Sequence, residues 1–191
     1  MGERIRSGAI AIRSLSVGHA FCSTKTAWVG LILATFLLVS TCTIDKDAGI
    51  PTDFEIVLFE NADHPKGEIL RLSHFHGQPV VLNFWFPSCP PCVAEMPEFE
   101  IAYQTHKPQG VEFLGVQMLG LDTVEEGQAF VKELGVNYAI GPDTEGEIIR
   151  GYAVAGFPTT VFLDRDLNIV RQWTGMLDSE KLEEFIQELL N

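Results

Sequence analysis

Basic side chains are scarce in this sequence. Its 191 residues include 13 Lys and Arg against 26 Asp and Glu, which gives a formal net charge of −13. Residues 1–50 hold slightly more bases than acids, so residues 51–191 carry about −15. Because a strongly acidic surface repels the phosphate backbone, this composition argues against nucleic acid as a partner.

Cysteine is also scarce, with four residues in the whole chain. A small secreted domain held together by disulfides would be shorter and richer in cysteine. The sequence also lacks internal repeats and low-complexity tracts, so it does not indicate a solenoid or a disordered chain. Its apolar fraction of 46% and its length fit one globular domain of ordinary size plus an additional segment.

That additional segment lies near the N-terminus. Residues 26–44 contain no charged side chain, and a run of about 19 apolar residues just reaches the length that crosses a bilayer as a helix. Bases precede the run and acids follow it, which places the N-terminus in the cytoplasm and the remainder outside. We therefore predict a basic cytoplasmic region at 1–26, a membrane segment at 27–44, a linker at 45–52 and a folded domain at 53–191.

Three interpretations of residues 27–44 stay open. We favour an uncleaved signal anchor. The second is a lipoprotein signal, because Val39-Ser40-Thr41-Cys42 resembles a lipobox in which Cys42 is the lipidated residue, although Thr41 departs from the usual pattern. The third is a buried core helix, for which the flanking sequence offers no packing partner.

Residues 53–191 alternate between strand-like and helix-like stretches. The predicted strands are 54–59, 69–72, 80–84, 111–117, 138–140, 159–163 and 169–174, and the predicted helices are 91–105, 123–134, 145–152 and 179–190. Thr123 and Ser179 are the expected N-caps of the second and fourth helices. Alternating elements imply a parallel core with helices on both faces, to which the final hairpin adds antiparallel strands. The predicted fold class is α/β, with a mixed central sheet.

One short motif carries chemistry: Cys89-Pro90-Pro91-Cys92, directly after a predicted buried strand and at the start of a helix. At a helix N-terminus, the positive end of the dipole and the free N–H groups favour the Cys89 thiolate, the form that attacks disulfides. Proline at position 91 suits the first turn of a helix. Cys92 lies one turn further on and is the expected resolving thiol. The pattern predicts a redox-active disulfide that needs no other cofactor.

Half of a zinc site is the alternative interpretation of this motif. Tetrahedral zinc requires two further nitrogen or sulfur ligands. Cys22 and Cys42 are separated from the motif by the predicted membrane segment or lie within it, and His74 and His76 show no characteristic spacing to it. The sequence therefore favours redox chemistry over metal binding, and we predict no metal site.

Four motifs in order give the chain a family resemblance. They are Val81-Leu82-Asn83-Phe84-Trp85, then Cys89-Pro90-Pro91-Cys92, then Glu95-Met96-Pro97, and finally Gly156-Phe157-Pro158-Thr159-Thr160. With this set, residues 53–191 resemble the thioredoxin superfamily, specifically its membrane-tethered TlpA/ResA-like branch with a redoxin domain of the AhpC/TSA type. The resemblance implies a three-layer thioredoxin-like sandwich with extra N-terminal strands.

The resemblance also implies roles for individual residues. Pro158 occupies the position of a cis-proline that faces the active site and leaves the Phe157 backbone free to pair with a substrate strand. Glu95 shares a helix face with Cys92 and matches a functional glutamate, which a raised pKa would suit to shuttle the Cys92 proton. A solvated surface glutamate is the alternative. The expected substrate contacts are Phe157, Pro158, Trp85, Ser88, Pro90 and Pro91.

Two positions mark where the chain stands within this superfamily. Ser88 is found where the family usually has tryptophan, directly before the first cysteine, which changes the exposed surface beside Cys89. Asn83 is found where cytoplasmic thioredoxins carry a buried aspartate. This second difference resembles the exported branch and leaves proton transfer to Glu95.

The predicted function is that of an extracytoplasmic, membrane-anchored thiol-disulfide oxidoreductase. We expect it to reduce disulfides in exported proteins, and the family resemblance implies a role in cytochrome c biogenesis, with apocytochrome c as a substrate. Because an exported dithiol becomes oxidised in that compartment, a membrane dithiol donor is the implied partner. The alternatives are a copper metallochaperone, which typically spaces its cysteines by three residues and adds a distant histidine, and a thiol peroxidase, whose Pro-x-x-x-Thr pattern is absent.

Overall fold

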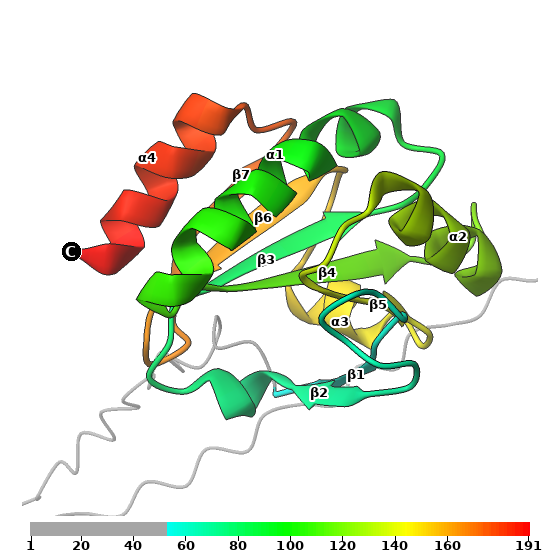
Figure 1. Ribbon diagram of the computed structural model, residues 1–191, viewed down its shortest axis with the longest axis horizontal. Coiled ribbons are helices and arrows are strands. Elements are labelled where there is room, and N and C mark those ends of the chain that lie inside the picture. Colours follow the sequence, from blue (N-terminus) through cyan, green and yellow to red (C-terminus); the bar gives the residue numbers. More distant parts are fainter. Residues whose placement is uncertain (1–52) are drawn as a thin grey trace, which may run out of the picture. The chain divides into compact units, whose positions relative to one another are not determined.

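A five-stranded mixed sheet lies at the centre of this protein in the computed structural model, which describes residues 53–191 (Figure 1). In spatial order its strands are β5 (Ala139–Asp143), β4 (Glu112–Met118), β3 (Val80–Trp85), β6 (Thr159–Leu163) and β7 (Ile169–Thr174). Strands β3, β4 and β5 are parallel to one another, whereas β6 runs antiparallel to both of its neighbours, β3 and β7. The predicted mixed sheet is confirmed.

The central strand β3 is buried along its whole length. It pairs with β4 on one side and with β6 on the other, so it has no exposed edge. A strand that is covered on both faces has no solvent side, and its sequence therefore reads as a nearly continuous apolar run rather than an alternating one. Asn83 interrupts this run as a buried polar residue.

Helices and short strands cover the two faces of the sheet. One face packs against α1 (Pro90–His106), α2 (Val124–Leu134) and α4 (Ser179–Leu190). The other face packs against α3 (Glu147–Gly151), a 3-10 helix (Leu72–Phe75) and a separate antiparallel pair, β1 (Glu55–Val57) and β2 (Ile69–Arg71). A second 3-10 turn, Lys107–Gln109, follows α1. The extra N-terminal strands and the two-sided helix arrangement are therefore confirmed.

The helix starts confirm one predicted cap and correct the other. Thr123 caps α2 in a reciprocal capping box with Glu126, as the Thr-x-x-Glu pattern indicates. At α4 the cap is Asp178, whose carboxylate accepts a hydrogen bond from the Lys181 N–H at 2.8 Å. The prediction of Ser179 is wrong because the helix begins one residue earlier than a serine cap requires, which places Ser179 in its first turn.

Several predictions concern residues that lie outside the described part of the chain. The cytoplasmic region 1–26, the membrane segment 27–44, the linker 45–52 and the lipidation of Cys42 all fall there. Within residues 53–191, no helix is both long and apolar enough to cross a membrane.

Candidate active site

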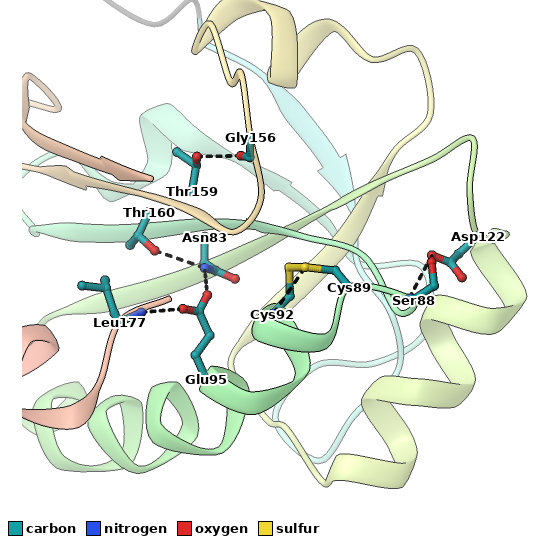
Figure 2. The surroundings of a disulfide bond; sticks show 10 residues. All are labelled: Asn83, Ser88, Cys89, Cys92, Glu95, Asp122, Gly156, Thr159, Thr160 and Leu177. Carbon is teal, nitrogen blue, oxygen red and sulfur yellow. Dashed lines mark hydrogen bonds between the residues drawn. A yellow bond between two sulfur atoms is a disulfide. The ribbon is translucent and has the colours of Figure 1, made fainter. Parts of the chain in front are cut away.

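The two cysteines of the motif form a disulfide at the start of α1 (Figure 2). Cys89 is the N-cap of the helix and Cys92 lies in its first turn, with their Cα atoms 5.3 Å apart. Strand β3 ends four residues before Cys89, and a turn closed by the Cys89 N–H and the Phe86 carbonyl, 3.1 Å apart, joins the two elements. The predicted placement of both cysteines is confirmed.

The helix N-terminus points a donor at the first sulfur. The Cys92 backbone N–H donates to Cys89 Sγ at 3.3 Å, which makes that sulfur the cap of the helix. The same free N–H groups and the positive end of the helix dipole stabilise a thiolate when the disulfide opens. Cys92 is fully buried and Cys89 retains only a small exposed area. The arrangement suits Cys89 as the attacking sulfur and Cys92 as the resolving one.

Glu95 lies one turn beyond Cys92 and is buried, with 1% of its surface exposed. One of its carboxylate oxygens accepts a hydrogen bond from Asn83 Nδ2 at 2.8 Å, and the other accepts one from the Leu177 N–H at 2.9 Å (Figure 2). The alternative of a solvated surface glutamate is therefore wrong. The carboxylate lies inside the protein, between the central strand and the loop that follows β7.

Burial raises the pKa of Glu95 to about 7. Loss of hydration is the largest cause, because it disfavours the charged carboxylate. The hydrogen bonds from Leu177 and Asn83 act in the opposite direction and lower the pKa, since they favour the charged form. A carboxyl group with a pKa near neutrality can both accept and release a proton, which is what an acid-base group beside a thiol requires.

The Phe157–Pro158 peptide bond is cis, as the family resemblance implies. The loop is held by the Gly175 N–H, which donates to the Pro158 carbonyl at 2.9 Å, and by a contact of 5.2 Å between the ring centres of Phe157 and Phe86. Phe157 lies outside the strands, and none of the loop and turn hydrogen bonds formed between backbone groups of residues 53–191 uses its N–H or C=O.

Ser88 is exposed beside Cys89 and is bound to an aspartate from another loop. Both its backbone N–H and its hydroxyl donate to Asp122 Oδ2, at 3.0 and 2.7 Å (Figure 2). Asp122 lies between β4 and α2. It therefore ties this loop to the turn that presents the first cysteine.

The remaining predicted substrate contacts differ in their exposure. Pro90 and Pro91 are exposed at the first turn of α1, and Phe157 is half-buried. Pro158 is buried. The prediction that Trp85 contacts substrate is wrong, because its side chain is completely buried and packs against Phe130.

Metal ligands do not gather in the described residues. Within 53–191, no group of three or more His, Cys, Asp and Glu side chains is arranged to hold an ion. His74 and His76 are both exposed.

Three contacts at the site could not be predicted from the sequence. Asp122 reaches Ser88 from 34 residues away, and Leu177 reaches Glu95 from 82 residues away. The Thr160 hydroxyl accepts a hydrogen bond from Asn83 Nδ2 at 3.1 Å, across the β3–β6 pair. These contacts depend on the spatial arrangement of the strands, and Leu177 contributes a backbone N–H that any residue type except proline would supply.

Comparison with known proteins agrees with this geometry. Residues 52–172 match the AhpC/TSA family. A curated relative, the thiol-disulfide oxidoreductase ResA of Bacillus thuringiensis subsp. konkukian (strain 97-27), is 32% identical over 124 residues, which cover 65% of this chain and 70% of that protein.

Two solved structures extend the comparison. The thioredoxin domain of a thiol-disulfide oxidoreductase from Bacteroides vulgatus is 21% identical with a TM-score of 0.63, covering 75% of this chain and 97% of that one. A secreted disulfide oxidoreductase of Mycobacterium tuberculosis, homologous to DsbE of E. coli, is 26% identical with a TM-score of 0.60, covering 71% and 96% of the two chains. The fold is therefore thioredoxin-like, as the resemblance implies.

Proposed function

The chain belongs to the AhpC/TSA family and is a thiol-disulfide oxidoreductase, and we propose that it reduces disulfides in exported proteins through Cys89 and Cys92. The observation that supports these two residues most strongly is the disulfide at the N-terminus of α1, next to a buried carboxyl group. This arrangement supports dithiol exchange, because helix N–H groups stabilise a thiolate and a carboxyl group with a pKa of about 7 can take up a proton.

The proposed reaction begins with both cysteines reduced. The Cys89 thiolate attacks one sulfur of the partner's disulfide, which breaks that bond, forms a mixed disulfide and releases the partner's other sulfur as a thiolate. Cys92 then loses its proton and attacks Cys89 Sγ, which releases the partner's second sulfur. Two electrons pass from the enzyme to the partner, which takes up two protons, and the enzyme is left as the disulfide.

Glu95 is the proposed acceptor of the Cys92 proton. It lies three residues after Cys92, so the two side chains share a face of α1. A raised pKa matches the group to proton exchange near neutral pH, and the hydrogen bonds from Asn83 and Leu177 hold the carboxylate in place.

The partner is proposed to bind as an extended segment along Phe157. The unpaired backbone N–H and C=O of this residue can form strand-like hydrogen bonds with a substrate. Pro90 and Pro91, which follow Cys89 in the chain, add two exposed apolar side chains. Backbone pairing does not depend on the substrate's side chains, so this mode suits an enzyme that acts on several proteins.

We further propose that residues 27–44 anchor the chain and that the domain works outside the cytoplasm, where a membrane dithiol carrier returns it to the reduced state. The bases that precede this run, the acids that follow it and the description of one relative as secreted support this placement. Apocytochrome c, whose C-x-x-C-H cysteines must be reduced before haem attachment, is the substrate that the family resemblance suggests.

Reduction of insulin by the full-length protein with a dithiol donor tests the activity. We expect turnover by the wild type and none by Cys89→Ser, while peroxide consumption and copper binding at one equivalent stay at background. Reductase activity that survives Cys89→Ser would overturn the assignment. An oxidised C-x-x-C-H peptide offered in place of insulin tests the apocytochrome substrate.

The direction of electron flow is tested by the reduction potential of the couple. A reductant is expected in the thioredoxin range, near about −270 mV, and a value near about −120 mV would make the protein an oxidant. Equilibration of the Cys89–Cys92 pair with glutathione or dithiothreitol buffers gives this value directly.

A further inference from the structure

Asn83 lies on the face of β3 that the active-site cysteines pack against. Side chains alternate along a strand, so residues 81, 83 and 85 share one face. Val81 and Trp85 belong to the same buried cluster as Cys89 and Cys92. Asn83 itself is 1% exposed. A neutral but strongly polar amide is therefore enclosed beside the disulfide.

The amide of Asn83 is only partly satisfied. Both hydrogens of Nδ2 are used, one by a Glu95 oxygen at 2.8 Å and one by the Thr160 hydroxyl at 3.1 Å. The oxygen, Oδ1, is buried and has no hydrogen-bond partner. When Glu95 is ionised its oxygens can only accept, so the end of the amide that faces it is the nitrogen. The open group is therefore an acceptor.

This open acceptor is drawn on the side of the amide toward Cys92 in Figure 2, while the nitrogen points toward Glu95 and Thr160. In the disulfide Cys92 Sγ carries no hydrogen and cannot donate. A buried cysteine that is released from a disulfide favours the neutral thiol, because burial disfavours the thiolate. Reduction thus creates a new donor in the same enclosed region.

We propose that Asn83 Oδ1 accepts a hydrogen bond from the Cys92 thiol when the disulfide is reduced. The inference rests on the proposed redox cycle of the two cysteines. An incoming dithiol supplies two electrons and two protons and leaves as a disulfide; the Cys89–Cys92 bond breaks, and one of the protons ends on Cys92 Sγ, where Asn83 receives it as a hydrogen bond.

Two consequences follow for the redox couple. The oxidised form leaves a buried oxygen unsatisfied and the reduced form satisfies it, so Asn83 favours the reduced form and raises the reduction potential. The same amide also donates to Glu95, the proposed proton acceptor. Asn83 therefore contacts the Cys92 thiol through its oxygen and Glu95 through its nitrogen. It acts as a positioning residue for proton transfer between them.

The reduction potential of the full-length protein tests the first consequence. In Asn83→Leu the open acceptor is absent from both the oxidised and the reduced state. We expect the equilibrium with glutathione to shift about tenfold toward the disulfide, which lowers the reduction potential by about 30 mV. Thr160→Val is the matched control, because it removes a partner of Nδ2 but keeps Oδ1, and its potential should stay at the wild-type value. Asn83→Ala is a second variant if leucine prevents folding.

The Glu95→Gln background separates a direct effect on Cys92 from one that passes through the carboxyl group. If Asn83 acts on the thiol itself, replacing it by leucine lowers the potential by a similar factor in both backgrounds. An effect that vanishes in Glu95→Gln would overturn the proposal, as would a potential that rises or stays constant in Asn83→Leu.

A spectroscopic measurement detects the hydrogen bond of the Cys92 thiol directly. The S–H stretching band of Cys92 is the infrared difference between Cys89→Ser and the Cys89→Ser, Cys92→Ser double variant, which cancels Cys22 and Cys42. We expect this band at a lower frequency than that of a thiol without a hydrogen bond in an apolar solvent, because donating a hydrogen bond weakens the S–H bond. In Asn83→Leu the band should move to higher frequency. A band at the free-thiol position refutes the contact, whereas failure of insulin reduction with a shifted band would refute the proposed function alone.

Discussion

The carboxylate of Glu95 on α1 accepts a hydrogen bond from the backbone N–H of Leu177, 82 residues later in the chain, at 2.9 Å. This contact joins the helix that carries Cys92 to the loop between β7 and α4. Asn83 on the central strand donates to the other oxygen of the same carboxylate. One buried acid therefore connects three elements of the fold directly beside the disulfide.

Burial of Glu95 makes the stability of the protein depend on pH. Its pKa rises from 4.5 to about 7 on folding, so the folded state holds this proton more tightly than the unfolded state. The stabilisation that comes from this tighter proton binding is fully present below pH about 4.5 and is lost as pH rises through about 7. The shift corresponds to a difference of about 3 kcal/mol across this interval. Urea unfolding at several pH values measures it.

Glu95→Gln provides the comparison for that series. The difference in unfolding free energy between wild type and variant should change by about 3 kcal/mol between pH 4.5 and pH 8, with the wild type losing stability relative to the variant as pH rises. A difference that stays constant over this range would show that the carboxyl group does not titrate as described.

Glu95→Gln should also slow the second half of the exchange reaction. Without a proton acceptor, Cys92 deprotonates slowly, and we expect release of the partner from the mixed disulfide to fall by about 100-fold at pH 7. Acid quenching followed by mass spectrometry counts the mixed disulfide as it accumulates. Glu98→Gln is the control, because Glu98 lies three residues further along α1 and should leave the rate unchanged.

Asp122 places a negative charge beside the attacking sulfur through its hydrogen bonds to Ser88. Asp122→Asn keeps an acceptor oxygen but removes the charge, so the Cys89 thiolate becomes easier to form. We expect alkylation of Cys89 in the reduced protein to accelerate roughly threefold at neutral pH. Peptide mapping follows Cys89 separately from the other cysteines.

Glu133→Gln serves as the matched control for Asp122→Asn, since Glu133 is an exposed acid on α2. If both variants accelerate alkylation equally, the effect comes from net charge and the local role of Asp122 is contradicted.

The corrected cap of α4 has a direct consequence for stability. Asp178→Ala removes the acceptor for the Lys181 N–H and should lower the free energy of unfolding by about 1 kcal/mol. Ser179→Ala changes a residue inside the first turn and should stay within about 0.5 kcal/mol of the wild type. Denaturant titrations of the two variants decide between the caps, and a larger loss in Ser179→Ala would restore the serine.

Features that depend on neighbouring residues were predictable from the sequence. The strands at 159–163 and 169–174 have the predicted bounds, because an apolar run and a polar turn define a hairpin locally. The position of Cys89 at the start of α1 also follows from a local pattern, because an apolar strand precedes it and prolines that suit the first turn of a helix follow it. Thr123 carries its own signal through Glu126.

Features that depend on register were not predictable. Strand β5 continues to Asp143, beyond the predicted end at residue 140, because it pairs with β4 as far as Met118. The proline at position 142 suggests a strand end, yet an edge strand tolerates it. The burial of Trp85 and the partners of Glu95 depend on which elements lie opposite one another, and a single sequence does not encode that in any local pattern.

Trapping of the mixed disulfide tests the central claim most directly. The Cys92→Ser variant cannot resolve the intermediate, so the reduced variant incubated with an oxidised protein substrate should form a stable adduct. We predict that mass spectrometry finds the substrate linked to Cys89 and that dithiothreitol releases it. An adduct at another cysteine, or none while the wild type still reduces the same substrate, would contradict the account.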